Sequence, residues 1–181
     1  MSETEEQLIE RAKHDADAFG VLYERYVDRI YSYIVYRVGD VREAEDLTAR
    51  VFFRALARIR DYHQRGIPFI AWLYRIAHNL VANWYRDNSR RRDVRLDEAL
   101  MVVEKSAGPE HVAERNDEAR ALLEVIRTLP DERQQVLILK YVEGLSNAEI
   151  AQVMGRSEGA IKSLYHRTLL ELRQAMPKED F

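Results

Sequence analysis

The sequence predicts an all-α protein: two small helical domains joined by a flexible linker, with a helix-turn-helix in the C-terminal one. Helix breakers are scarce, because the 181 residues include only 7 glycines and 4 prolines. Apolar residues recur at the spacing of amphipathic helices, and no stretch keeps the alternation of a strand. We place the domains at residues 1–95 and 117–181, with the linker at residues 96–116.

The composition indicates a folded, soluble chain with no overall positive charge. Hydrophobic residues make up 46% of the sequence, charged residues 33%, and the formal net charge is −3, so any nucleic-acid contact must come from local basic patches. The absence of cysteine excludes disulfides and thiolate metal sites and agrees with a cytoplasmic location. The acidic start is no signal peptide, and no apolar run reaches the ~18 residues of a membrane span, so we expect no membrane insertion.

Two helices are predicted at the start of the chain. A short one covers about residues 4–14, and a longer one starts near Asp15 or Asp17 and ends at Val38, before Gly39. The apolar face of the longer helix comprises Phe19, Leu22, Tyr26, Ile30, Tyr33 and Ile34.

Asp40 should cap a third helix, with Glu43 as its capping-box partner. Its predicted buried face comprises Ala44, Leu47, Val51, Ala55, Leu56 and Ile59. Phe53 lies off this face together with Asp46, Arg50 and Arg54. An aromatic residue there indicates either a protein partner or packing on a neighbouring helix, and the sequence leaves both readings open.

A polar loop over residues 62–67 leads into a fourth helix that starts near Pro68. One side of this helix is apolar, and a second stripe beside it holds Trp72, Arg75, Asn79, Asn83, Arg86 and Arg90. Carboxamides can read base edges, guanidinium groups hold phosphates, and an aromatic ring can stack on an unpaired base. A solvated helix face with a basic end is the alternative.

The second domain should begin with a helix over about residues 117–128, and Pro130 should open the next one. A capping box from Ser146 to Glu149 starts a short helix that stops at Gly155, and Ser157 caps the last helix. Two helices joined by so tight a turn predict a DNA-binding helix-turn-helix, with an ordinary helical hairpin as the alternative. The outward positions of the last helix are Glu158, Lys162, Ser163, His166 and Arg167.

Two blocks of sequence resemble a known family. The first carries AEDLTARVFFRAL and FIAWLYRIAHNLVANWYRDNSRR, and the second carries LPDERQQVLILKYVEGLSNAEIAQVMGRSEGAIKSLYHR. In this order and spacing they resemble a bacterial RNA polymerase sigma factor of the extracytoplasmic-function group, and the resemblance covers residues 20–92 and 117–175. Such proteins perform no chemistry and carry no metal or cofactor.

The resemblance implies a role for each group of residues. The surface that docks on the clamp helices of the polymerase's largest subunit would contain Asp46, Leu47, Arg50, Phe53 and Arg54. The minus-ten element would be read and melted by His63, Arg65, Trp72, Arg75, Asn79, Asn83, Arg86 and Arg90, with one base flipped into a protein pocket. The minus-thirty-five element would be met by Lys140, Glu158, Lys162, Ser163, His166 and Arg167. The polymerase flap and an anti-sigma factor are further partners that the resemblance implies.

The sequence departs from the family pattern at four positions. Ala49 and Arg50 replace a pair that is often polar and acidic, which changes the chemistry of the docking surface. Leu164 and Leu169 stand where many members have arginine, so the last helix is less basic and should make fewer phosphate contacts.

Three other classes of function fit the sequence less well. A stand-alone helix-turn-helix regulator would bind duplex DNA unaided, usually as a dimer, but would not need the stripe from Trp72 to Arg90. An enzyme is not indicated, because the five histidines are scattered and no HExxH, P-loop or GxGxxG motif occurs. A helical adaptor would leave both the basic stripe and the helix-turn-helix unexplained.

Overall fold

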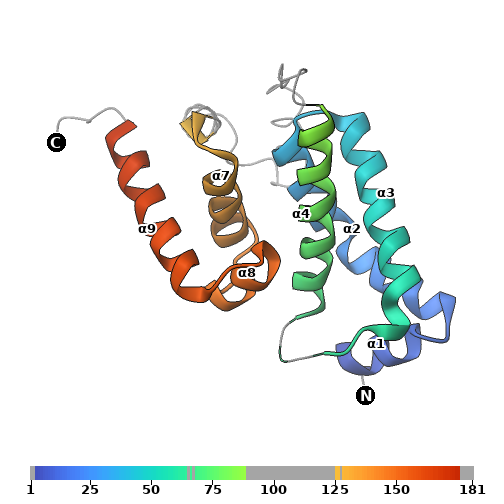
Figure 1. The fold of residues 1–181 in the computed structure, drawn as a ribbon. Helices are drawn as coiled ribbons and strands as arrows, with labels where there is room; N and C mark the ends of the chain where they lie inside the picture. Colours follow the sequence, from blue (N-terminus) through green and yellow to red (C-terminus); the bar gives the residue numbers. More distant parts are fainter. Residues whose placement is uncertain (1–2, 65, 67, 89–124, 127, 176–181) are drawn as a thin grey trace, which may run out of the picture. The chain divides into compact units, whose positions relative to one another are not determined.

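The computed structural model describes residues 3–64, 66, 68–88, 125–126 and 128–175, and the regular structure in these ranges is helical throughout (Figure 1). The chain divides into two compact units, Met1–Ala99 and Leu100–Phe181. The predicted all-α fold is therefore confirmed. The linker predicted at residues 96–116 lies outside the described residues, so its boundaries stay a prediction.

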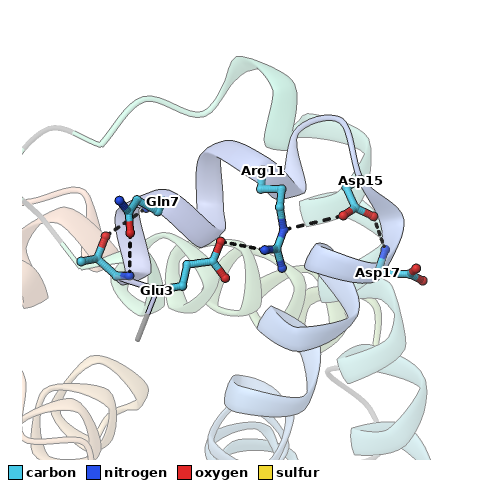
Figure 2. A network of polar contacts seen from close by, with 6 residues as sticks. Glu3, Gln7, Arg11, Asp15 and Asp17 are labelled. Carbon is cyan, nitrogen blue, oxygen red and sulfur yellow. Dashed lines mark hydrogen bonds and ion pairs between the residues drawn. The ribbon is translucent and has the colours of Figure 1, made fainter. Parts of the chain in front are cut away.

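The first unit begins with α1 (Glu5–Ala12) and α2 (Ala16–Val38), which pack against each other. Thr4 caps α1 in a capping box with Gln7, and Asp15 caps α2 through the backbone N–H of Asp17. Figure 2 shows this corner, where Arg11 lies 2.9 Å from a Glu3 carboxylate oxygen and 3.6 Å from one of Asp15. The charged side chains thus tie the turn between the two helices, while Leu8, Ile9 and Ala12 are buried.

Gly39 ends α2 in the left-handed conformation (φ 68°), which glycine adopts without steric cost, and α3 (Val41–Arg58) follows at once. The Asp40 side chain caps α3 by accepting from the backbone N–H groups of Arg42 and Glu43. The capping-box role predicted for Glu43 is not what the structure shows: its carboxylate accepts a hydrogen bond from Trp84 of α4 (Phe69–Asp87). A short 3-10 helix, η1 (Ile59–Asp61), ends α3.

The core of the first unit forms where α2, α3 and α4 pack together. Its largest fully buried side chains include Tyr33 and Tyr74, whose rings meet edge to face with their centroids 5.2 Å apart. Because α4 buries Phe69, Leu73, Ala77 and Leu80 in this core, the remaining face of α4 points away from it.

The second unit contains α7 (Asp131–Leu137), the π-helix η3 (Ile138–Val142), α8 (Asn147–Met154) and α9 (Glu158–Ala175). Both α7 and α8 pack on α9. A buried cluster of Leu129, Leu137 and Leu172 is flanked by Val125, Ile126, Tyr165 and Leu169. Most of the helix predicted at residues 117–128 lies outside the described residues.

The helix-turn-helix has the predicted caps. Ser146 and Glu149 form a full capping box at the start of α8. Gly155 ends α8 with φ 64°, and the Ser157 hydroxyl accepts from the backbone N–H of Ala160 in the first turn of α9. The sharp turn between α8 and α9 is therefore held by groups that the sequence alone identifies.

Candidate nucleic-acid and protein interfaces

The polar stripe predicted on the fourth helix lies on the face of α4 that the core leaves free. Arg75, Asn79 and Arg86 are exposed, and Asn83 is half-buried. The guanidinium of Arg86 donates to the Asn83 side-chain oxygen at 3.0 Å and lies near Asp87, with an N–O distance of 3.9 Å. Two carboxamides and three guanidinium groups were predicted for this stripe. The structure brings all of them onto one face except Arg90, which lies outside the described residues.

Trp72 is less available for stacking on an unpaired base than the sequence suggests. Its ring is half-buried, and its centroid lies 4.7 Å from that of Tyr62 and 5.4 Å from that of Phe69. Burial, followed by the charge of Glu5, raises the pKa of the Tyr62 hydroxyl above its usual 10.0. Trp72 is thus part of an aromatic cluster at the start of α4, and only its remaining exposed surface could stack on a base.

Two DNA-binding residues were predicted in the loop before α4, and the structure describes one of them, His63. His63 is exposed, and its Nδ1 lies 2.8 Å from the backbone carbonyl oxygen of Asp61. Because a carbonyl oxygen only accepts, Nδ1 carries the proton in this contact and Nε2 remains for an outside partner. Gly66 has φ 71°, so the loop turns through a conformation that suits glycine. Arg65 lies outside the described residues.

The outer face of α3 presents four of the five residues assigned to the docking surface. Asp46, Arg50, Phe53 and Arg54 are exposed, and Arg50 pairs with Asp46 at 3.7 Å, one helical turn away. Phe53 is 74% exposed, which excludes the alternative that it packs on a neighbouring helix of the described unit.

Two assignments on α3 need correction. Leu47 is only 1% exposed, because it belongs to the buried stripe of α3, so its side chain cannot touch a partner from there. Leu56 was predicted to be buried and is 48% exposed, since the buried positions advance in steps of three and four residues and leave it outside. It lies three residues after Phe53, and that spacing is the signal by which the sequence could have placed it beside Phe53.

On α9, the five outward positions predicted from the sequence are all exposed: Glu158, Lys162, Ser163, His166 and Arg167. The Arg167 guanidinium donates to the Ser163 backbone oxygen at 3.4 Å, which directs it along the helix. Leu164 is buried, so the departure from the family's arginine at this position adds a core contact of α9 instead of a surface charge.

Lys140 behaves differently from the α9 residues. It is half-buried in η3, and its ammonium group donates to the side-chain oxygen of Asn147, 3.0 Å away in the first turn of α8. An ammonium group has two further protons to offer, so a phosphate contact remains chemically available to it. The hydrogen bond to Asn147 therefore holds the Lys140 side chain against the first turn of α8.

Sequence reasoning missed one aromatic pair in the second unit, formed by the exposed Tyr141 and the half-buried Tyr165. Tyr141 is 62% exposed, and its hydroxyl oxygen lies 2.5 Å from that of Tyr165 on α9. This hydrogen bond, more than burial, raises the pKa of Tyr165 to about 12. The π-helical turn of η3 shifts the helical register after Ile138, which periodicity of 3.6 residues does not anticipate.

The described residues contain neither a cluster of metal ligands nor a membrane-spanning helix. Within those ranges, no group of three or more histidine, aspartate or glutamate side chains is arranged to hold a metal ion. Among the helices described, none is both long and apolar enough to cross a membrane.

Comparison with known proteins identifies the same two units. The chain matches the family described as sigma-70 region 2 over residues 22–91 and the family described as sigma-70, region 4 over residues 119–172. The ECF RNA polymerase sigma factor BldN of Streptomyces coelicolor is 42% identical across 96% of this chain and 66% of its own length. The RNA polymerase sigma factor YlaC of Bacillus subtilis is 33% identical across 90% of this chain and 94% of its own.

The fold also occurs in a solved protein, CnrH, in complex with the cytosolic domain of CnrY. The likeness to CnrH has a TM-score of 0.69 and covers 92% of this chain and 93% of CnrH at 24% identity, which concerns the fold alone. The family matches lie one in each unit, in the order and spacing that the two sequence blocks predict. The ECF RNA polymerase sigma factor SigW of Bacillus subtilis is 31% identical across 91% of this chain and 91% of its own length. The chain therefore belongs to the extracytoplasmic-function group of the sigma-70 family of RNA polymerase sigma factors.

Proposed function

We propose that this transcription initiation factor divides its contacts among three exposed helix faces. The outer face of α4 reads the melted minus-ten element, the outer face of α9 reads the duplex minus-thirty-five element, and the outer face of α3 docks on core RNA polymerase. One observation carries the proposal: α4 buries its apolar side in the core and presents Arg75, Asn79 and Arg86 outward, with Asn83 at the edge of the same face.

The chemistry of the α4 face suits single-stranded DNA. Asn79 and Asn83 can each donate and accept a hydrogen bond at a base edge, and unpaired bases leave all their edges open to such contacts. The guanidinium groups of Arg75 and Arg86 can hold the phosphates on either side. His63, in the loop before α4, offers one ring nitrogen to the same strand. A duplex-only reader would have no use for this combination.

The chemistry of the α9 face suits a major groove. The second helix of a helix-turn-helix enters the groove with its N-terminal residues toward the bases. Glu158 and Lys162 lie in the first two turns of α9, where a carboxylate can accept from cytosine and an ammonium can donate to guanine. Ser163, His166 and Arg167 follow on the exposed side and can contact bases or phosphates, and Lys140 can reach the backbone from η3.

The α3 face suits a protein partner. An exposed phenylalanine among charged side chains matches the usual arrangement of an apolar anchor within a polar rim. We assign Asp46, Arg50, Phe53 and Arg54 to contact with the clamp helices of the polymerase, and we add Leu56 because it is exposed beside Phe53 in the helical repeat. The chain would act in the cytoplasm, where the polymerase works, and would itself catalyse no reaction.

Two further protein contacts belong to the proposal. The flap of the core polymerase is the expected partner of the second unit. An anti-sigma factor is the expected regulator, since CnrH, which shares this fold, occurs in complex with the cytosolic domain of another protein.

In vitro transcription with purified core polymerase tests the proposal. The chain, the core enzyme and a library of genomic fragments should give transcripts that start at defined promoters and that neither protein gives alone. Binding should then be compared on intact duplex and on the same promoter with a pre-melted bubble. A stand-alone regulator would bind the intact duplex without core polymerase and would bind the pre-melted promoter no more tightly. That result would contradict the proposal.

A further inference from the structure

The last turn of α4 is held by two adjacent aromatic side chains that reach different helices. The indole N–H of Trp84 donates to the Glu43 carboxylate in the first turn of α3, with an N–O distance of 2.9 Å. The Tyr85 hydroxyl donates to the backbone oxygen of Arg37 in the last turn of α2. The Arg37 guanidinium also lies 5.5 Å from the centre of the Tyr85 ring. Both anchors therefore fix α4 to the corner where α2 passes into α3.

These anchors lie within the part of α4 that carries one of the proposed base-reading residues. Asn83 precedes Trp84 directly, and Arg86, which donates to the Asn83 side-chain oxygen, follows Tyr85. The turn is also closed by Asn88, whose backbone N–H and side-chain amide both donate to the Trp84 carbonyl oxygen. The end of a helix frays more readily than its middle, because its last carbonyl groups lack partners within the helix.

Asn79, the other carboxamide of the stripe, is placed differently. It lies between Ala77 and Leu80, which are 0% and 1% exposed, so core packing holds its part of α4. Asn83 is the last carboxamide of the stripe before the end of the helix, and its position depends on the polar contacts of that end. A hydrogen bond to a base requires a donor–acceptor distance within a few tenths of an ångström, so small movements of this turn should affect Asn83 first.

We propose that Glu43 and Trp84 form a positioning pair that holds Asn83 in register for base recognition. The inference rests on the function proposed above for the α4 face. Glu43 would act through Trp84: it lies in the first turn of α3, and its carboxylate accepts the indole hydrogen bond. A charged acceptor makes this bond stronger than one between two neutral groups.

Three substitutions test the hydrogen bond while preserving most of the surroundings. Trp84→Phe removes the N–H and keeps an aromatic ring, Glu43→Ala removes the acceptor, and Glu43→Gln keeps a neutral acceptor oxygen in the same place. Trp84→Phe and Glu43→Ala should each slow promoter opening roughly three- to tenfold, a fraction of what one base contact supplies. Glu43→Gln should restore most of the rate. A Glu43→Gln rate as low as that of Glu43→Ala would overturn the proposal.

A double-mutant cycle separates positioning from general loosening of the fold. In an Asn83→Ala background, Trp84→Phe should cause no further loss of promoter opening, because the contact it positions is already absent. In an Asn79→Ala background, Trp84→Phe should slow promoter opening by the same factor as in the wild-type protein. Equal losses in all three backgrounds, with rates normalised to folded protein, would overturn the positioning role. If Asn83→Ala alone leaves opening unchanged, the proposed function of the α4 face is what fails.

Discussion

Arg86 and Asn83 form a hydrogen bond across one turn of α4, in which the guanidinium donates to the Asn83 side-chain oxygen at 3.0 Å. This bond uses one of the two lone pairs of that oxygen, so Asn83 can still accept through the other and can donate to a base through its amide NH2 group. Such a donor suits an acceptor on the base edge, for example a ring nitrogen or a carbonyl oxygen. The guanidinium keeps further N–H groups for a phosphate, so a single pair can contact a base and its backbone.

We predict that Asn79→Ala and Asn83→Ala each reduce promoter opening while leaving core binding intact. Both residues lie on the outward face of α4, and loss of one good base contact should cost about 1–3 kcal/mol. Single-round transcription from duplex promoters measures the effect, and the melting temperature shows whether the variants still fold. Gln174→Ala is a matched control, since it removes an exposed carboxamide at the far end of α9. Wild-type rates on every promoter would refute the assignment.

We predict that Lys162→Ala and Arg167→Ala weaken binding to the upstream element and flatten its salt dependence. Each lost phosphate contact should lower the slope of log K against log salt by roughly 0.9. Binding of the complex with core polymerase, measured from low to moderate salt, gives this slope. Arg173→Ala provides the comparison, because it removes an exposed arginine from the last turn of the same helix and should leave the slope unchanged. If neither Lys162→Ala nor Arg167→Ala changes the slope, α9 is not oriented as proposed.

We predict a loss of stability at alkaline pH that depends on Tyr26. Its hydroxyl donates to Glu5 at 2.8 Å, and burial, followed by this hydrogen bond and the Glu5 charge, raises its pKa to about 12. Between pH 10 and 12 the unfolded chain releases this proton and the folded chain keeps it. The free energy of unfolding therefore falls as pH rises through that window.

Tyr26→Phe should remove this part of the pH dependence, which amounts to about 2 kcal/mol by pH 12. Urea denaturation of both proteins at several pH values measures it. The two curves should run parallel between pH 6 and 9 and converge above pH 10. Curves that stay parallel up to pH 12 would show that Tyr26 does not hold its proton more tightly in the folded chain.

The helix boundaries were predictable because local signals set them. Asp15, Asp40 and Ser146 cap helices through short-range hydrogen bonds, and Gly39 and Gly155 end helices in conformations that other residues avoid. These choices depend on residues no more than four positions apart. A single sequence therefore contains the information that fixes them.

The side-chain partners across helices were not predictable in the same way. Periodicity places Glu43 near a helix start, but only the packing of α4 on α3 brings Trp84 to its carboxylate. Periodicity did predict that Leu47 is buried, whereas Leu56, assigned to the same buried face, is exposed. The polar stripe on α4 was predictable as a face, whereas the half-buried position of Trp72 depends on Tyr62 from a different segment.

Phe53 and Arg50 lie side by side on the exposed outer face of α3. Phe53 is 74% exposed, and Arg50 pairs with Asp46 at 3.7 Å beside it. If this face docks on core polymerase, Phe53→Ala should weaken the complex by about 1–2 kcal/mol or more, as expected for a buried aromatic anchor. Arg50→Glu should slow association, and the effect should be larger at low salt than at high salt.

Neither change should lower the melting temperature of the free protein much, because both side chains face solvent there. The weak surface ion pair between Arg50 and Asp46 contributes little to stability, so its loss should not obscure the result. Glu6→Ala, which removes an exposed carboxylate from α1, is the matched control for core affinity. If Phe53→Ala, Leu56→Ala and Arg50→Glu all leave core affinity at the wild-type value, the outer face of α3 is not the docking surface. The polymerase contact would then have to lie on another exposed helix of the first unit.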